Sequence, residues 1–241
     1  MTAVAGIVGP ILFATALLSL TALQYDFMVG IGWQPWRDPA GAWPSGLALG
    51  PYGWAQNASF IVSGVLLMIF ATGLHLGVTG GLGSRAGPGL LLVSGTAMAL
   101  MGFETDPIRH TGPRTLHGLV HDLAFVLFVL TLLLALFFLW RRLRRSALWR
   151  GYARYTLATG LSATLLLLLP GVSYYLFLAV VLAWFELLAL GLWESTGHRD
   201  SQFQSRSAGQ PGFLPSTSRM QLPPGSASPP YWTRSRRWKW L

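Results

Sequence analysis

Six long apolar stretches, separated by shorter polar or proline-rich segments, set the pattern of this chain. An apolar run of about twenty residues is long enough to cross the hydrocarbon core of a membrane as a helix. The break at Pro170 and Gly171 keeps the last two stretches apart, because a single helix over 153–193 would be about 60 Å long. The sequence therefore predicts an all-α, polytopic integral membrane bundle. Its six transmembrane helices are expected at residues 4–24, 54–78, 87–104, 117–140, 153–170 and 172–193.

Composition also indicates an integral membrane protein. Hydrophobic residues make up 52% of the 241 residues, charged residues only 10%, and the mean hydropathy is +0.49. The absence of cysteine excludes disulfides, thiol catalysis and thiolate metal sites. The net charge of +9 comes from basic residues between and after the apolar stretches, a pattern typical of membrane topology rather than of a nucleic-acid-binding face. The lipid bilayer is therefore the expected partner, and nucleic acid is not.

The lysines and arginines predict how the chain is threaded, since they concentrate on the cytoplasmic side of a membrane protein. With the N-terminus in the cytoplasm, only Arg37, Arg109 and Arg114 of the 17 basic residues fall outside. No lysine or arginine precedes the first apolar stretch, so we interpret this stretch as a retained helix and not as a signal peptide. We expect a multi-pass protein of the bacterial inner membrane with both termini cytoplasmic.

The chain divides into two regions of different composition. Residues 1–195 hold the six apolar stretches, whereas residues 196–241 are rich in serine, proline, glycine and glutamine and lack a periodic apolar face. Such a segment buries too little apolar surface to fold, so we expect a disordered cytoplasmic tail. Its end, YWTRSRRWKWL, interleaves cations with tryptophan and is either a contact for anionic lipid or an unpatterned terminus.

Titratable residues are concentrated between the third and fourth predicted helices. The stretch FETDPIRHTGPRTLHGLVHD, residues 103–122, holds three of the eight acids and three of the five histidines. The third helix should end ahead of Pro107, because residues before proline avoid helical geometry, and Thr115 is a suitable N-cap for the fourth. His117 and His121 then lie one turn apart on one helix face. The predicted topology puts this stretch at the outer surface.

This outer cluster permits several chemical interpretations. Asp106, His117 and His121 are of the ligand types that zinc or a similar divalent metal takes, and the same set could serve a metal-assisted membrane hydrolase. Alternatively the cluster gates a ligand or ion, or its charges satisfy one another as a structural cap between two helices. A structural cap or small-ligand site is our main hypothesis. Supporting residues are expected to be Asp26, Asn57, Glu104, Arg109 and Arg114.

Glu186 lies inside the last apolar stretch, seven residues before Trp193. A carboxylate at this depth costs about 2.5–3.5 kcal/mol on insertion scales unless it is protonated or paired. It is either a neutral acid buried for packing or a group that handles protons or substrate, and the second possibility is the basis for an alternative function as a transporter or permeation protein. A transmembrane bis-histidine haem is not expected, because His75 is predicted at the opposite membrane face from His117 and His121.

Four blocks of the sequence carry a family resemblance. They are GPILFATALLSLTALQYD, GWAQNASFIVSGVLLMIFATGL, GFETDP and TLHGLVHDLAF. Together they resemble a bacterial and archaeal membrane family catalogued as domain of unknown function 998, over about residues 5–195. The resemblance implies an integral membrane protein of about six helices whose activity has no assignment. The family's motif positions fall here on Asp106, His117 and His121, with Asp26 and Asn57 as weaker matches.

Overall fold

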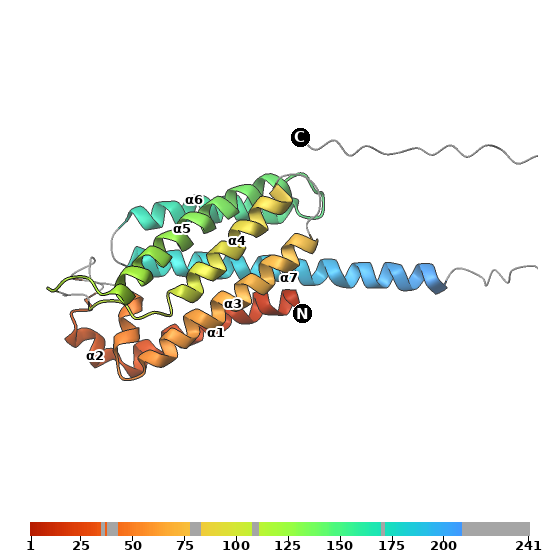
Figure 1. The fold of residues 1–241 in the computed structure, drawn as a ribbon. Helices are drawn as coiled ribbons and strands as arrows, with labels where there is room; N and C mark the ends of the chain where they lie inside the picture. The colour runs from red at the N-terminus through yellow and green to blue at the C-terminus, as the bar shows by residue number, and fades with distance from the viewer. Residues whose placement is uncertain (35–36, 38–42, 78–82, 108–110, 170–171, 209–241) are drawn as a thin grey trace, which may run out of the picture. The chain divides into compact units, whose positions relative to one another are not determined.

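The structure is a computed structural model of the chain, and it describes residues 1–34, 37, 43–77, 83–107, 111–169 and 172–208, without the side chains of 196–208. These residues contain helices and no strand, which confirms the predicted all-α class (Figure 1). The elements are α1 (Thr2–Leu23), α2 (Tyr25–Gly30), the 3-10 helix η2 (Pro44–Leu49), α3 (Gly53–Gly77), α4 (Gly83–Leu100), α5 (Leu116–Leu143), α6 (Arg150–Leu168) and α7 (Ser173–Ala208).

The six apolar stretches coincide with the long helices α1, α3, α4, α5, α6 and α7. Among the described residues, α1, α3, α5 and the Ser173–Ser195 part of α7 are long and apolar enough to cross a membrane. The other two are shorter, with 18 residues in α4 and 19 in α6, and each carries an arginine in its first turn, Arg85 and Arg150. The chain is therefore a helical membrane protein with four candidate spans among its described residues.

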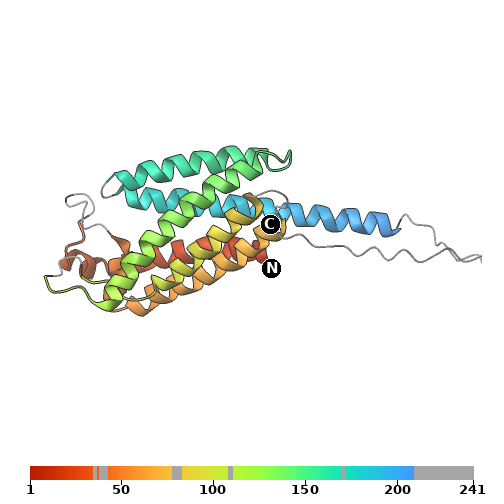
Figure 2. The same ribbon diagram turned by 45° about the horizontal axis from the view of Figure 1, so that its top comes forward.

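The long helices pack against one another in chain order, α1 on α3, α3 on α4, α4 on α5 and α5 on α6 (Figures 1 and 2). Within the compact unit Met1–Ser201, α7 contacts α6 and α3. Trp184 Nε1 donates a hydrogen bond to Thr156 Oγ1 of α6 at 3.0 Å. Phe185 packs on Phe70 of α3, with ring centroids 6.2 Å apart. The last helix therefore links α6 to α3.

Glycine allows α3 and α4 to touch through their backbones. A Cβ added to Gly95 of α4 would lie 2.8 Å from the carbonyl oxygen of Gly64 and 2.7 Å from Met68 Cγ, closer than real Cβ atoms approach other groups. A Cβ added to Gly89, also in α4, would meet no atom within 4 Å. The contact between these two helices therefore depends on Gly95 and on the facing Gly64, but not on Gly89.

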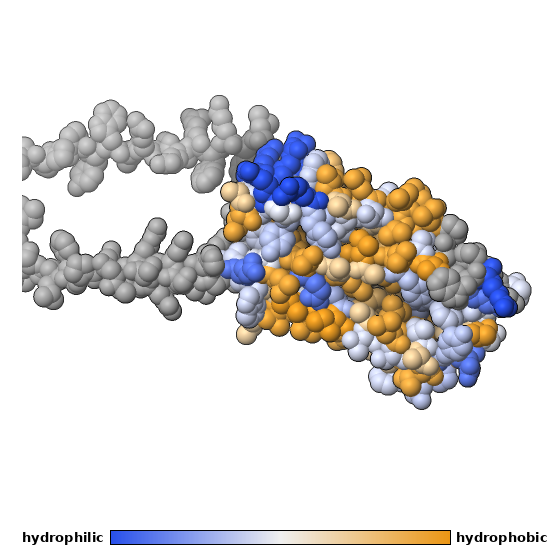
Figure 3. Space-filling model, turned by 180° about the vertical axis from the view of Figure 1, so that it is seen from behind, coloured by the Kyte–Doolittle hydropathy of each residue, from blue (hydrophilic) through white to orange (hydrophobic). Residues whose placement is uncertain are grey.

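Large apolar side chains cover much of the outer surface of this unit. Leu161, Leu165 and Leu168 of α6 are 66%, 60% and 77% exposed, and Leu123 of α5 is 60% exposed. Figure 3 shows a largely hydrophobic face over the described residues. Soluble monomers rarely expose apolar patches of this extent, so contact with lipid explains this surface.

The C-terminal ends of α4 and α5 differ from the prediction. α4 stops at Leu100 rather than at residue 104, because residues 101–103 turn away from the helix. α5 continues to Leu143 rather than to residue 140, which places Arg141 and Arg142 in its last turn. Cations there interact favourably with the helix dipole, and this favours the longer helix.

α7 also continues further than the sequence suggests. Its backbone is helical through Ala208, where the composition predicts disorder from residue 196. Residues 194–208 contain no proline, and the first proline after them is Pro211, so nothing in this stretch prevents helix propagation. Residues 209–241, with the remainder of the predicted tail and its basic end, lie outside the described residues, and their contact with anionic lipid stays a prediction.

Candidate functional site

Asp106 fixes the start of α5. Thr115 is the N-cap of this helix, as predicted, and its Oγ1 accepts a hydrogen bond from the Gly118 amide at 3.0 Å. The Asp106 carboxylate accepts two hydrogen bonds from Thr115, from the hydroxyl at 2.7 Å and from the amide at 3.2 Å. An added Cβ on Gly118 would lie 2.5 Å from Asp106 Cγ, so the glycine lets the carboxylate sit against the helix. Asp106 therefore ties the loop before α5 to the first turn of that helix.

His121 closes the end of α4. Its side chain is 4% exposed, and Nδ1 lies 2.9 Å from the carbonyl oxygens of both Met101 and Phe103. Carbonyl groups at the C-terminal end of a helix have no partner within it, so the imidazole supplies one. The ring also packs edge-on against Phe60, with centroids 5.9 Å apart. His121 therefore joins α5 to α4, as a structural cap between the two helices requires.

Other members of the predicted cluster have different surroundings. His117 is exposed, and its ring lies on that of Phe103, with centroids 5.9 Å apart. Asp122 forms an ion pair with Arg114, and both side chains are partly exposed, by 43% and 64%. Glu104 is exposed in the turn after α4. These side chains lie near one another in sequence but do not share one centre.

The described residues do not bring the predicted metal ligands together. Asp106 is bonded to Thr115, His121 is bonded to two backbone carbonyls, and His117 is exposed. In the part of the chain that the structure describes, no group of three His, Asp or Glu side chains is placed to hold a metal ion. The sequence spacing allowed such a group, but Asp106 and His121 make hydrogen bonds to different partners, and His117 lies against Phe103. The donor set therefore does not fit zinc or another divalent cation.

Two supporting residues from the prediction lie elsewhere. Asp26 is exposed in the first turn of α2, beyond the end of α1. Asn57 lies in the second turn of α3, where its Oδ1 is buried without a hydrogen-bond partner among the described residues. The adjacent Gln56 is fully buried, and neither of its amide atoms has such a partner there. A third predicted residue, Arg109, lies outside the described residues.

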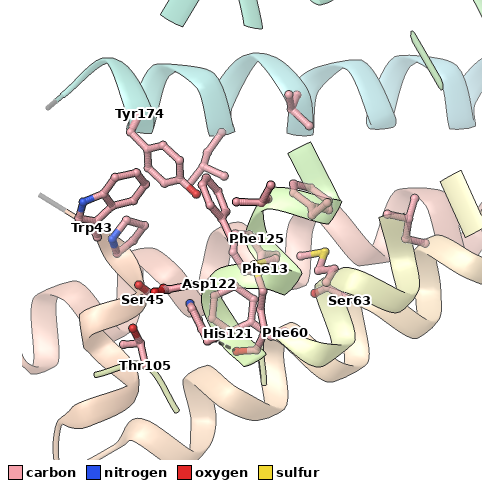
Figure 4. Close-up of a pocket in the computed structure, with 18 of the residues that line it drawn as sticks. Phe13, Trp43, Ser45, Phe60, Ser63, Thr105, His121, Asp122, Phe125 and Tyr174 are labelled. Carbon is pink, nitrogen blue, oxygen red and sulfur yellow. Dashed lines mark hydrogen bonds between the residues drawn. The ribbon is translucent and has the colours of Figure 1, made fainter. Parts of the chain in front are cut away.

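A cavity of about 530 Å³ lies inside the helical unit, beside His121. Cavities of this size hold small organic ligands in other proteins. Its apolar part is lined by aromatic and aliphatic side chains, among them Phe13, Phe60, Leu67 and Phe70. Figure 4 shows four residues of the polar end, Ser45, Thr105, His121 and Asp122, near the rings of Phe13 and Phe60. The polar end is formed by Ser45, Thr105, Asp106, Arg114, His121 and Asp122, and the partly exposed Arg114 and Asp122 show that it reaches the surface.

Trp43, which immediately precedes η2, forms an aromatic wall of this cavity. Its ring centroid lies 4.8 Å from that of Tyr174 in α7 and 5.6 Å from that of Phe125 in α5. Sequence reasoning missed the cavity, because its walls come from α1, η2, α3, α4, α5 and α7. The signal that could have drawn attention to Trp43 is the concentration of tryptophan in the first connecting segment, residues 25–53.

Two polar atoms on the cavity lining lack a hydrogen-bond partner within the described part of the protein. Ser63 is 4% exposed, and its Oγ is buried without a partner. In His121, both hydrogen bonds to the carbonyl oxygens of Met101 and Phe103 are made by Nδ1, and neither is made by Nε2. Buried polar groups are nearly always paired. Ser63 Oγ is thus a buried atom without a partner among the described residues, and both atoms could accept a hydrogen bond from a ligand in the cavity.

Glu186 lies outside this cavity. The residue is half-buried in α7, and its Oε1 is buried without a hydrogen-bond partner among the described residues. Its neighbour Phe185 lines the cavity, whereas Glu186 does not. Beyond the polar end, the lining on α3 holds the single hydroxyl of Ser63 and is then apolar at Leu67 and Phe70. The cavity therefore provides no polar path from the outer cluster to Glu186 through the described residues.

A family model described as protein of unknown function (DUF998) matches residues 7–193. This range contains every residue that lines the cavity except Ala5 and Gly6. The chain therefore belongs to this family, as the four sequence blocks indicate. No curated protein and no solved structure matches the chain.

Proposed function

We propose that this member of the DUF998 family is a multi-pass membrane protein that binds an amphipathic small molecule in its cavity. The observation that carries this proposal is the separation of polar from apolar side chains along the cavity lining. The charged side chains and most hydroxyl-bearing ones gather at the end that reaches the surface, and aromatic and aliphatic side chains, with Ser63 among them, line the interior. A ligand with one polar group and an apolar body would meet a matching surface along its length. Its polar group would also supply a hydrogen-bond partner for His121 at the polar end.

Exposed side chains on α4 and α6 support six membrane crossings. Leu157, Leu161 and Leu165 form a stripe at four-residue spacing along α6 and are 36%, 66% and 60% exposed. On α4, Leu92 and Val93 are 37% and 40% exposed. Helices of this length extend about 27–29 Å, close to the hydrocarbon thickness of about 30 Å. Lipid contact would account for these apolar surfaces on both helices.

The arginines support a cytoplasmic location for both termini. Arg141, Arg142 and Arg144 lie at the end of α5, and Arg150 and Arg154 at the start of α6, far along α5 from the polar end of the cavity (Figure 1). By the positive-inside rule the arginine-rich end faces the cytoplasm, so the cavity opens toward the outer side. The family resemblance is the basis for placing the protein in the bacterial inner membrane.

The other two functions considered from the sequence have less support. Metal-assisted hydrolysis requires ligands that converge, and Asp106, His117 and His121 have separate partners. Transport through Glu186 requires polar groups between it and the outer cluster, and the cavity interior is apolar. The structural cap is compatible with ligand binding, because His121 and Asp106 both hold helix ends and line the cavity.

A matched pair of variants in α3 tests ligand binding. Leu67 is 7% exposed and lines the cavity, whereas Ile69 is 40% exposed on the outer surface. Purified chain in lipid nanodiscs is titrated with a fluorescent long-chain amphiphile, and its melting temperature is recorded in parallel. Leu67→Trp should weaken binding by about tenfold or more because it fills the cavity, and Ile69→Trp should not. Equal binding by the two folded variants would contradict the proposal.

A further inference from the structure

The polar end of the cavity is richer in hydrogen-bond acceptors than in free cationic donors. Asp106 and Asp122 contribute carboxylates, and the guanidinium of Arg114 is already paired with Asp122. Ser45 and Thr105 add hydroxyl groups at the same end. The described lining thus holds two carboxylates and one guanidinium, and this excess of negative charge disfavours an anionic head group. This composition favours a ligand whose polar group donates a hydrogen bond.

The hydrogen bonds of His121 fix which of its nitrogens faces the ligand. The carbonyl oxygens of Met101 and Phe103 can only accept, so Nδ1, at 2.9 Å from each, carries the proton. The ring is buried and packs against Phe60, and none of its hydrogen bonds is to a carboxylate. Because an unpaired buried charge is costly, the imidazole is neutral and its Nε2 is an acceptor. His121 also lines the cavity, so this acceptor is available to a ligand there.

From these two observations we infer that the ligand is an uncharged lipid with a hydroxyl head group, and that His121 Nε2 accepts the hydrogen bond from this hydroxyl. The inference rests on the proposed function and narrows it to one class of ligand. The apolar chain lies between Phe13, Phe60 and Leu67, where the lining offers little but hydrocarbon and aromatic rings. A fatty alcohol and an acylglycerol share this chemistry, because both join a free hydroxyl to a long chain.

Three ligands that differ only in the head group test the inference on the unaltered full chain in nanodiscs. Hexadecanol has a hydroxyl donor, hexadecyl methyl ether has no donor, and hexadecanoate is an anion. Each competes with the same fluorescent amphiphile. Hexadecanol should bind about tenfold tighter than the ether, since the ether cannot donate a hydrogen bond to His121 Nε2, and tighter than the anion.

A comparison of two histidine variants assigns the selectivity to one side chain. His121→Phe removes the acceptor and should bring hexadecanol and the ether to equal affinity, whereas His117→Phe, at an exposed position, should keep the preference. Nitrogen NMR of the unaltered chain, labelled at histidine, detects the hydrogen bond to His121 Nε2 directly. This measurement does not require a variant to fold. Hexadecanol should shift an unprotonated Nε2 resonance, and the ether should leave it in place.

The outcomes separate this inference from the proposed function. If the ether or hexadecanoate binds as tightly as hexadecanol, or if the Nε2 resonance does not respond to hexadecanol, the hydroxyl-lipid assignment is wrong while amphiphile binding stands. If none of the three displaces the probe and Leu67→Trp binds the probe as well as Ile69→Trp does, the cavity is not a ligand site and both proposals fail.

Discussion

The Asp106 carboxylate accepts hydrogen bonds from both the hydroxyl and the amide of Thr115, nine residues later, and so holds the first turn of α5. Asp106→Ala removes both bonds and should lower the free energy of unfolding by about 1–2 kcal/mol. Thermal unfolding in detergent measures this change. Glu104→Ala, an exposed acid two residues earlier, is the control and should have little effect. A similar loss in both variants would mean that Asp106 does not hold the helix.

The backbone contact between Gly64 and Gly95 predicts a position-specific response to alanine. Gly95→Ala should destabilise the protein by about 1–3 kcal/mol, because the new methyl group overlaps the Gly64 carbonyl and the Met68 side chain. Gly89→Ala lies in the same helix with open space around its Cβ and should be neutral or stabilising. The melting temperatures of the two variants test this prediction. A Gly95→Ala variant as stable as the unaltered protein would refute the close contact.

Glu186 should tolerate the loss of its acid group. Its Oε1 is buried without a hydrogen-bond partner among the described residues, so a carboxylate there gains little from the protein and loses its hydration. Glu186→Gln should therefore keep the melting temperature or raise it. The free energy of unfolding should increase by at most about 2.5 kcal/mol. Glu194→Gln, at an exposed position of the same helix, should be neutral. A marked destabilisation by Glu186→Gln would instead indicate that the charge is paired.

The absence of native cysteine makes the topology directly measurable. A single cysteine at Gly112, in the exposed loop before α5, should react with a membrane-impermeant maleimide on intact cells. A cysteine at Leu148, which is 66% exposed between α5 and α6, should react only after the membrane is opened. This result is expected because the arginines around Leu148 stay in the cytoplasm. The reverse labelling pattern would place the polar end of the cavity in the cytoplasm.

Much of the fold could be predicted from the sequence. Apolar runs of membrane length mark the long helices, and Pro170 with Gly171 separates the last two. The Thr115 N-cap was also predictable, since capping depends on residue type and on neighbours within one turn. The extension of α7 to Ala208 was not, because polar composition describes an isolated segment and is a weak guide to helix propagation.

The sequence by itself determined the helical membrane class, the long apolar helices and the presence of histidines and acids near the start of α5. Only the tertiary structure decided what those groups do. His121 faces the carbonyls of Met101 and Phe103, while Asp106 faces Thr115, so the expected metal ligands separate and a cavity appears beside them. The physical reason is the distance along the chain over which each kind of interaction acts. Apolar periodicity and capping act over a few residues, whereas a side-chain direction depends on partners that packing brings from distant parts of the chain.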